Sequence, residues 1–159
     1  MKRLVIAILA VLAFGLAASA QGGKDIYNKY SGKQGVSSVY ISPAMFKLVK
    51  SLPEVEMGDE DMNMTNIVKS LDGMYIIDVE NPSLASELAR DVERYVASRK
   101  YEKLMEAIDE GEKMQIFIVQ KNNVVSDFVL YANEGDEVSF ISITGVMPLE
   151  EISKLVQQM

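Results

Sequence analysis

The chain has 159 residues, of which 48% are hydrophobic and 25% are charged. This length suits one domain with its own core, and this composition excludes a disordered or fibrous chain. The formal net charge is −7, and it becomes −9 if residues 1–20 leave with Lys2 and Arg3. An acidic surface disfavours nucleic acid and anionic membrane surfaces as partners, because both are negatively charged.

The N-terminus has the three parts of a secretory signal peptide. Lys2 and Arg3 form the positive start, residues 4–16 are the apolar segment, and residues 18–20 have the small side chains of a cleavage site. The apolar segment is shorter than the roughly 20 residues that cross a bilayer. We therefore predict cleavage after Ala20, export to the periplasm or the medium, and no stable membrane insertion afterwards.

Residues 21–35 are polar and rich in glycine, so we predict a flexible lead-in with at most one helical turn. A single domain follows over residues 36–159. Its first segment alternates between apolar and polar positions and predicts a strand in which Val39 and Ile41 face the core. Ser42-Pro43 then predicts a helix start, with serine as the cap and proline in the first turn.

An acidic loop at residues 54–63 precedes a predicted short helix at 65–71 and a turn at Asp72-Gly73. Residues 74–79 predict a second strand. Asn81-Pro82 repeats the cap-and-proline start of a helix with a continuous apolar stripe. The stripe consists of Leu84, Leu88, Val92, Tyr95 and Val96.

The next apolar residues have helical spacing and predict another helix that ends at Gly111. They are Tyr101, Leu104, Met105 and Ile108. On the preceding helix, Glu87, Asp91 and Arg94 are spaced to form pairs on the exposed face.

Residues 113–144 predict three antiparallel strands joined by tight turns. Residues 114–119 are apolar on both faces, which favours an interior strand. Asn122-Asn123 suits the first turn, and Gly135 suits the second, since both residue types tolerate positive φ. Met147-Pro148 predicts the start of a last helix, whose apolar side contains Leu149, Ile152, Leu155, Val156 and Met159.

The element order β-α-β-α-β-β-β-α predicts an α+β fold, with a mostly antiparallel sheet of about five strands and helices packed against it. Three residues are candidates for binding. Tyr40 and Phe46 are aromatic residues next to the first helix start, and a structural role in this strand and helix start is the favoured interpretation. Asp127 lies in an apolar strand with Val125 and Val129 on its face, either as an outward or edge-facing charge that blocks strand addition or as a buried functional carboxylate.

Four residues near the acidic loop are candidate metal ligands. Asp59 and Asp61 match the first positions of a calcium loop, but Met64 stands where the turn needs glycine. Met62 and Met64 are soft ligands that suit copper(I), but no His or Cys exists to assist them. A solvated acidic loop and ordinary packing of the methionines are the favoured interpretations, and no cofactor is expected.

Two segments carry a resemblance to a known family. Residues 35–46 read Gly-Val-Ser-Ser-Val-Tyr-Ile-Ser-Pro-Ala-Met-Phe, and residues 101–105 read Tyr-Glu-Lys-Leu-Met. Together with the exported start and the later strands, they resemble the domain of unknown function numbered 4252, found in small exported proteins of Gram-negative bacteria. The resemblance implies no activity, substrate or site residue.

Two classes of function remain open. The absence of His and Cys removes the usual general base and thiolate nucleophile, which favours a non-catalytic module that binds an envelope protein or a small ligand. The alternative is a carboxylate-dependent hydrolase that acts on envelope glycans. A further hypothesis is strand addition at an unprotected sheet edge.

Overall fold

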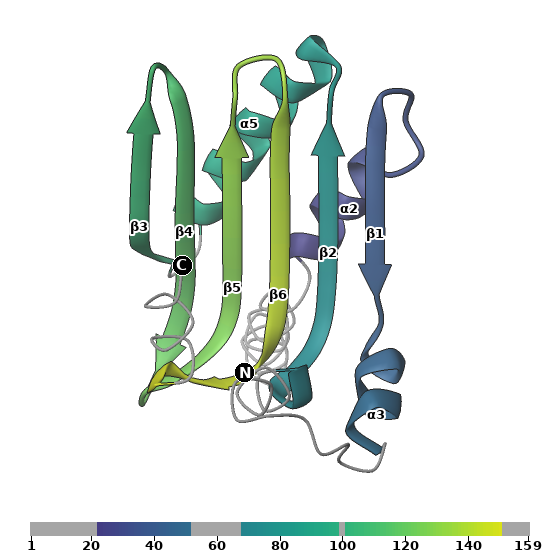
Figure 1. Cartoon of the computed structure of the whole chain (residues 1–159), viewed down its shortest axis with the longest axis vertical. Helices are drawn as coiled ribbons and strands as arrows, with labels where there is room; N and C mark the ends of the chain where they lie inside the picture. The colour runs from purple at the N-terminus through teal and green to yellow at the C-terminus, as the bar shows by residue number, and fades with distance from the viewer. Residues whose placement is uncertain (1–21, 52–67, 99–100, 151–159) are drawn as a thin grey trace, which may run out of the picture.

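The computed structural model describes residues 22–51, 68–98 and 101–150, and its centre is a six-stranded antiparallel sheet (Figure 1). The spatial order β1-β2-β6-β5-β4-β3 makes β1 and β3 the two edges. The α+β prediction is confirmed, with one strand more than expected. The strands are β1 (Val36–Ile41), β2 (Leu71–Val79), β3 (Glu102–Asp109), β4 (Glu112–Lys121), β5 (Val124–Asn133) and β6 (Val138–Pro148).

Two helices, α2 (Gly22–Tyr30) and α5 (Pro82–Ala97), cover one face of the sheet, which we call the helix face (Figure 1). Helix α5 begins at the predicted cap, because the Asn81 side chain accepts hydrogen bonds from the backbone N–H groups of Ser83 and Leu84. The core between the helices and the sheet includes Ile26, Tyr30, Ile77, Leu88, Val92, Val129, Tyr131 and Phe140.

A second apolar cluster lies on the opposite face. Ile118, Phe128 and Ile143 are consecutive partners across β4, β5 and β6, and they belong to this cluster. Helix α3 (Pro43–Ser51) contributes Phe46, which is 5% exposed. The helix start was predicted correctly, since the Ser42 hydroxyl accepts a hydrogen bond from the N–H of Met45 at 3.3 Å.

The predicted helix around residues 101–108 is wrong, because this segment is the edge strand β3. Met105 and Glu106 pair with residues of β4, and the connecting turn places Glu110 at φ 47° and Gly111 at φ 95°. Gly111 therefore turns a hairpin and does not end a helix.

The predicted lead-in is also wrong over residues 22–30, which form α2. Ile26 and Tyr30 are separated by four positions, so one helix face buries both against the sheet. A Cβ atom on Gly23 would lie 2.3 Å from the hydroxyl oxygen of Ser142. The glycine that disfavours a helix in the sequence is therefore what allows α2 to approach the sheet.

Two boundaries differ from the predictions. Asp72 and Gly73 lie inside β2, where the register shifts, and Met147 and Pro148 end β6 and do not start a helix. Residues 149 and 150 are helical, and the rest of the predicted last helix lies outside the described residues. The turns at Asn122-Asn123 and Gly135 are confirmed by their positive φ angles.

Candidate interaction surface

Three tyrosines form a cluster near the β1 edge of the helix face. Tyr40 on β1 and Tyr75 on β2 are register partners, and their rings stack at 4.9 Å with an interplanar angle of 9°. Tyr27 of α2 contacts both, with ring centroids 6.0 Å from Tyr40 and 5.5 Å from Tyr75. We call this group the tyrosine cluster. Because Tyr40 remains 46% exposed, the cluster presents an aromatic surface to solvent.

The environment of the cluster suppresses ionisation of its middle ring. Burial, followed by the neighbouring Tyr40 phenol, raises the pKa of Tyr75 above its ordinary value. Next to Tyr75 in the same row lies Ser142 of β6, which is 2% exposed beneath Gly23. The described residues offer the Ser142 hydroxyl no hydrogen-bond partner. This part of the surface can therefore bind through aromatic contact and phenolic hydroxyl groups.

The edge strand β1 exposes residues on both of its faces. Val39, on the face opposite Tyr40, is 47% exposed, so the prediction that it faces the core is wrong. Ile41 does pack against the second apolar cluster. Phe46 is enclosed in that cluster on the opposite face, so it does not join the tyrosine cluster.

Asp127 shares the helix face with Tyr40 but lies on the interior strand β5. A register shift between Val125 and Asp127 separates Val125 from this face, so only Val129 is on the predicted side. The Asp127 carboxylate accepts a hydrogen bond from the Ser126 hydroxyl at 2.6 Å. Since β5 is flanked by β4 and β6, Asp127 does not protect an edge.

A network of polar groups joins α2 to α5. Asp91 accepts hydrogen bonds from the Tyr30 hydroxyl at 2.7 Å and from Lys29 Nζ at 2.5 Å, and Arg94 Nη1 lies 3.3 Å from its second oxygen. The predicted pair between Asp91 and Arg94 is thus present, but the contacts from α2 were missed. Lys29 also pairs with Glu87 at 2.8 Å.

These contacts shift the pKa values of four groups, and that of Glu87 is lowered by its hydrogen bond with Lys29. The hydrogen bond to Asp91 raises the pKa of Lys29, while burial, reinforced by the hydrogen bond to Asp91, raises the pKa of Tyr30. Burial opposes ionisation of Asp91, but the hydrogen bonds from Lys29 and Tyr30 prevail and hold its pKa below the ordinary value. The network fixes α2 on α5 and positions the tyrosine cluster through Tyr27, three residues before Tyr30.

The two edges of the sheet differ in chemistry. Strand β1 (Val-Ser-Ser-Val-Tyr-Ile) has no charge and no proline, and it pairs with β2 without a register shift. Strand β3 carries charges at Glu102, Lys103, Glu106 and Asp109, and its register shifts between Lys103 and Met105. Charges and bulges are the usual protection of an edge strand. Strand β3 is therefore protected, and β1 is not.

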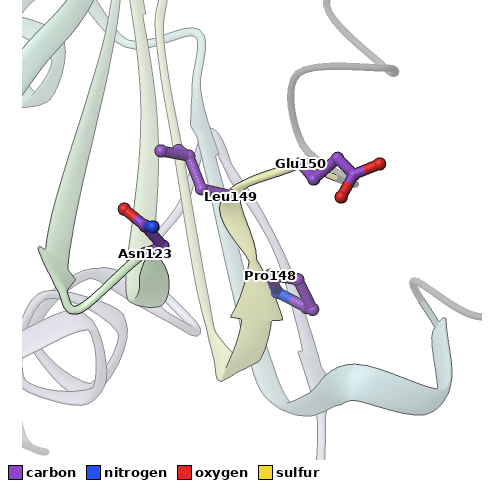
Figure 2. A pocket seen from close by; sticks show the side chains of 4 residues that line it. All are labelled: Asn123, Pro148, Leu149 and Glu150. Carbon is purple, nitrogen blue, oxygen red and sulfur yellow. The ribbon is translucent and has the colours of Figure 1, made fainter.

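A shallow pocket lies at the end of the sheet where the β4–β5 turn meets the end of β6 (Figure 2). Its volume is about 420 Å³, and its described lining residues are Asn123, Pro148, Leu149 and Glu150. The N–H of Leu149 donates to the carbonyl oxygen of Asn123 at 3.0 Å. Glu150 alone among these residues is ionisable, so the described lining offers no pair of acid and base.

The metal candidates Asp59, Asp61, Met62 and Met64 lie outside the described residues. Within residues 22–51, 68–98 and 101–150, no three acidic side chains are grouped closely enough to hold a metal ion. None of the helices in these ranges is both long enough and apolar enough to cross a bilayer.

Fold and surface together define an α+β domain with an aromatic cluster at an open, uncharged sheet edge. The chain belongs to the family described as Domain of unknown function (DUF4252), whose model matches residues 30–155. The resemblance seen in the sequence is thereby confirmed. No curated protein and no solved structure matches the chain.

The sequence identified Tyr40 but not its two partners. Tyr75 lies in an apolar strand and Tyr27 in a segment expected to be loose, and nothing local to either residue indicates the other. The repeated strand-then-helix pattern at residues 36–43 and 74–82 was the available hint, because two such strands could be neighbours in one sheet.

Proposed function

We propose that this protein is an exported, non-catalytic module that binds another protein of the cell envelope through the tyrosine cluster and strand β1. The observation that carries the proposal is the exposure of Tyr40 and Val39, 46% and 47%, on the two faces of one uncharged edge strand. Tyrosine is enriched at the energetically important centres of protein interfaces, because it adds a large apolar area and a polar hydroxyl with few rotatable bonds.

Export is part of the proposal and rests on residues 1–20. The charged start, the apolar segment and the small residues before Gln21 are those of a cleavable signal peptide. Mass spectrometry of the protein from fractionated cells tests this directly. A mature N-terminus at Gln21 in the periplasm or medium is expected, and an intact N-terminus in the cytoplasm would contradict export.

The alternative hydrolase needs two carboxyl groups about 5–10 Å apart on either side of a substrate. Among the described acids whose pKa is shifted, Glu137 is the one with a raised pKa, caused first by the neighbouring Asp78 carboxylate. Glu137 is exposed at the β5–β6 turn and not enclosed in a described pocket. No specific observation therefore favours this function, and we carry the binding module alone.

Site-specific photo-crosslinking in the producing cells tests the binding function. A photoreactive residue replaces Tyr40 in one variant and Ile108 in the control, because Ile108 is 67% exposed on the opposite edge strand. We expect one reproducible protein adduct from position 40 and none from position 108. Equal labelling from both positions, or no protein adduct from position 40, would overturn the proposal. A small-molecule adduct at position 40 would replace the protein partner with a small ligand.

A further inference from the structure

We infer that the free edge of β1 binds an extended, acidic segment of the partner protein, which adds to the sheet as a further strand. This inference rests on the proposed function and names the part of the partner that is recognised. It concerns β1 (Val36–Ile41), which is an edge strand of the sheet (Figure 1). Within the described residues, no other strand lies on its outer side.

The backbone of β1 has groups available for such a strand. The N–H of Glu80 donates to the carbonyl oxygen of Gly35 at 3.0 Å, so these residues form a hydrogen-bonded pair just before the strand begins. Bonded and non-bonded pairs alternate in an antiparallel ladder. The N–H and C=O groups of Val36, Ser38 and Tyr40 therefore point away from β2, toward the open edge.

The strand lacks three common features that block pairing, because it has no charged residue, no proline and no bulge. Two of its exposed side chains, Val39 and Tyr40, belong to residue types that are enriched in strands. A partner strand would place side chains next to Tyr40 on one face and next to Val39 on the other, since residues alternate between faces. Strand addition obtains affinity from main-chain hydrogen bonds and specificity from such alternate side chains.

The charge around β1 selects an acidic partner. Residues 22–51 contain five lysines and one acidic residue, Asp25, a net charge of +4 in a chain whose total is −7. Exposed Lys33 precedes β1, and exposed Lys47 follows it in α3, so positive charge lies beyond both ends of the strand. Lys29 is engaged with Asp91 at 2.5 Å and with Glu87 at 2.8 Å, and Lys50 with Asp72 at 3.3 Å. No ion pair of Lys33 or Lys47 occurs within the described residues, so these two lysines carry the charge argument.

The same charge disfavours a second copy of this chain at the edge. Antiparallel pairing of β1 with β1 of another copy would bring exposed Lys33 of one copy toward exposed Lys47 of the other, and like charges across an interface weaken association. An acidic segment gains attraction at the same place and is drawn to it faster at low ionic strength.

Amide hydrogen exchange tests the inference, and it is measured on the protein in the form that its producing cells release after processing. The probe is a pool of ten-residue synthetic peptides in which glutamate alternates with Val, Ile, Phe or Tyr, and the control pool has lysine in place of glutamate. Without peptide, amide exchange at Ser38 and Tyr40 should be fast and exchange at Val39 slow. With the glutamate pool, exchange at Ser38 and Tyr40 should slow tenfold or more, and the lysine pool should bind at least tenfold more weakly.

Two variants at one position separate backbone from side chain. Ser38→Pro removes an outward N–H that β2 does not use, whereas Ser38→Ala removes the hydroxyl and keeps the N–H. We expect Ser38→Pro to weaken binding of the glutamate pool about tenfold and Ser38→Ala to leave it within twofold. Circular dichroism confirms that each variant is folded, and peptides N-methylated at alternate residues give a second test that needs no change in the protein.

The outcomes are distinct. Binding without slower exchange at Ser38 and Tyr40, equal binding of both pools, or no binding overturns strand addition by an acidic segment. A dimer with slow exchange at these two amides before peptide is added also overturns it, because the edge is then occupied by a second copy. If any of these results is obtained but position 40 still gives a protein adduct in cells, strand addition is overturned and the proposed binding function is retained.

Discussion

Replacing Tyr30 by phenylalanine removes one hydroxyl group from the contact between α2 and α5 and leaves the ring in place. Tyr30 is fully buried, and its hydroxyl donates to Asp91 at 2.7 Å. Asp91 keeps Lys29 and Arg94 as partners after the substitution, so its charge is not left unpaired. The change therefore measures one charge-assisted hydrogen bond with little other disturbance.

The magnitude follows from the type of bond. A hydrogen bond to a charged group contributes about 1.5–3 kcal/mol to stability, and the remaining partners of Asp91 place this one near the lower end, at about 1.5 kcal/mol. With a urea m-value of about 1.5–2 kcal/mol per molar, the midpoint of unfolding should fall by nearly 1 M without a change in m. Tyr27→Phe is the matched control, because Tyr27 lies in the same helix and no hydrogen bond of its hydroxyl occurs within the described residues.

A double-mutant cycle with Asp91→Ala makes the reasoning refutable. Asp91→Ala leaves the buried Tyr30 hydroxyl without its acceptor, which should destabilise the protein by about 2–3 kcal/mol. In that background Tyr30→Phe should be neutral or stabilising, because it removes an unsatisfied buried group. Equilibrium urea unfolding measures all four proteins. If Tyr30→Phe lowers stability equally in both backgrounds, the hydroxyl does not act through Asp91 and the reasoning is wrong.

Four further predictions follow from single sites. Because its partners hold the pKa of Asp91 down, the ionised carboxylate stabilises the fold above about pH 4, and this stabilisation is lost as the pH falls. The urea midpoint of Asp91→Asn should therefore decrease less than that of the unchanged protein as the solution is acidified. Asn81→Ala removes a helix cap and should lower the unfolding free energy by about 1 kcal/mol. Ser142→Ala should be neutral or stabilising by up to about 1 kcal/mol in thermal unfolding, and a clear loss would show a partner for its hydroxyl. Gly145→Ala places a Cβ 2.4 Å from the carbonyl oxygen of Ser70 and should destabilise by about 2 kcal/mol or more, whereas an unchanged melting temperature would contradict this contact.

Elements whose ends carry their own chemistry could be predicted from the sequence. Asn81 caps α5 with its side chain, and Asn122 and Asn123 adopt the positive φ angles, 53° and 61°, that their residue type tolerates. Gly135, at φ 86°, likewise turns the chain between β5 and β6. In each case the deciding interaction lies within a few residues along the chain.

Elements decided by distant contacts could not be predicted. Strand β3 contains Met105 and Ile108 at helical spacing among good helix formers, and only pairing with β4 makes it extended. Helix α2 starts with Gly22 and Gly23, and its burial against the sheet outweighs their poor propensity. Tertiary packing overrides local preference in both segments.

The candidate site failed to appear in the sequence for the same reason. Tyr40 and Tyr75 are 35 positions apart, and only the register of β1 on β2 makes them neighbours. Tyr27 joins them because α2 packs on the sheet so that its ring contacts those of both Tyr40 and Tyr75. At Asp127, a distant contact separates residues that the sequence places together. Simple alternation puts Val125 on the same face as Asp127, but a one-residue register shift in β5 moves Val125 to the other face.

The two edge strands show why the pattern of apolar residues gave wrong predictions at the edges of the sheet, including the edge that we propose as the binding surface. The apolar residues of β3 have helical spacing, but the charges between them are of the kind that protects an edge strand from pairing. The uncharged sequence of β1 resembled a strand buried on one face, yet Val39 and Tyr40 are each about half exposed. A strand that pairs with another protein must keep the composition of an interior strand while it lies at the edge. The disagreement between the apolar sequence of β1 and its exposure is therefore itself an argument that this edge is covered by a partner.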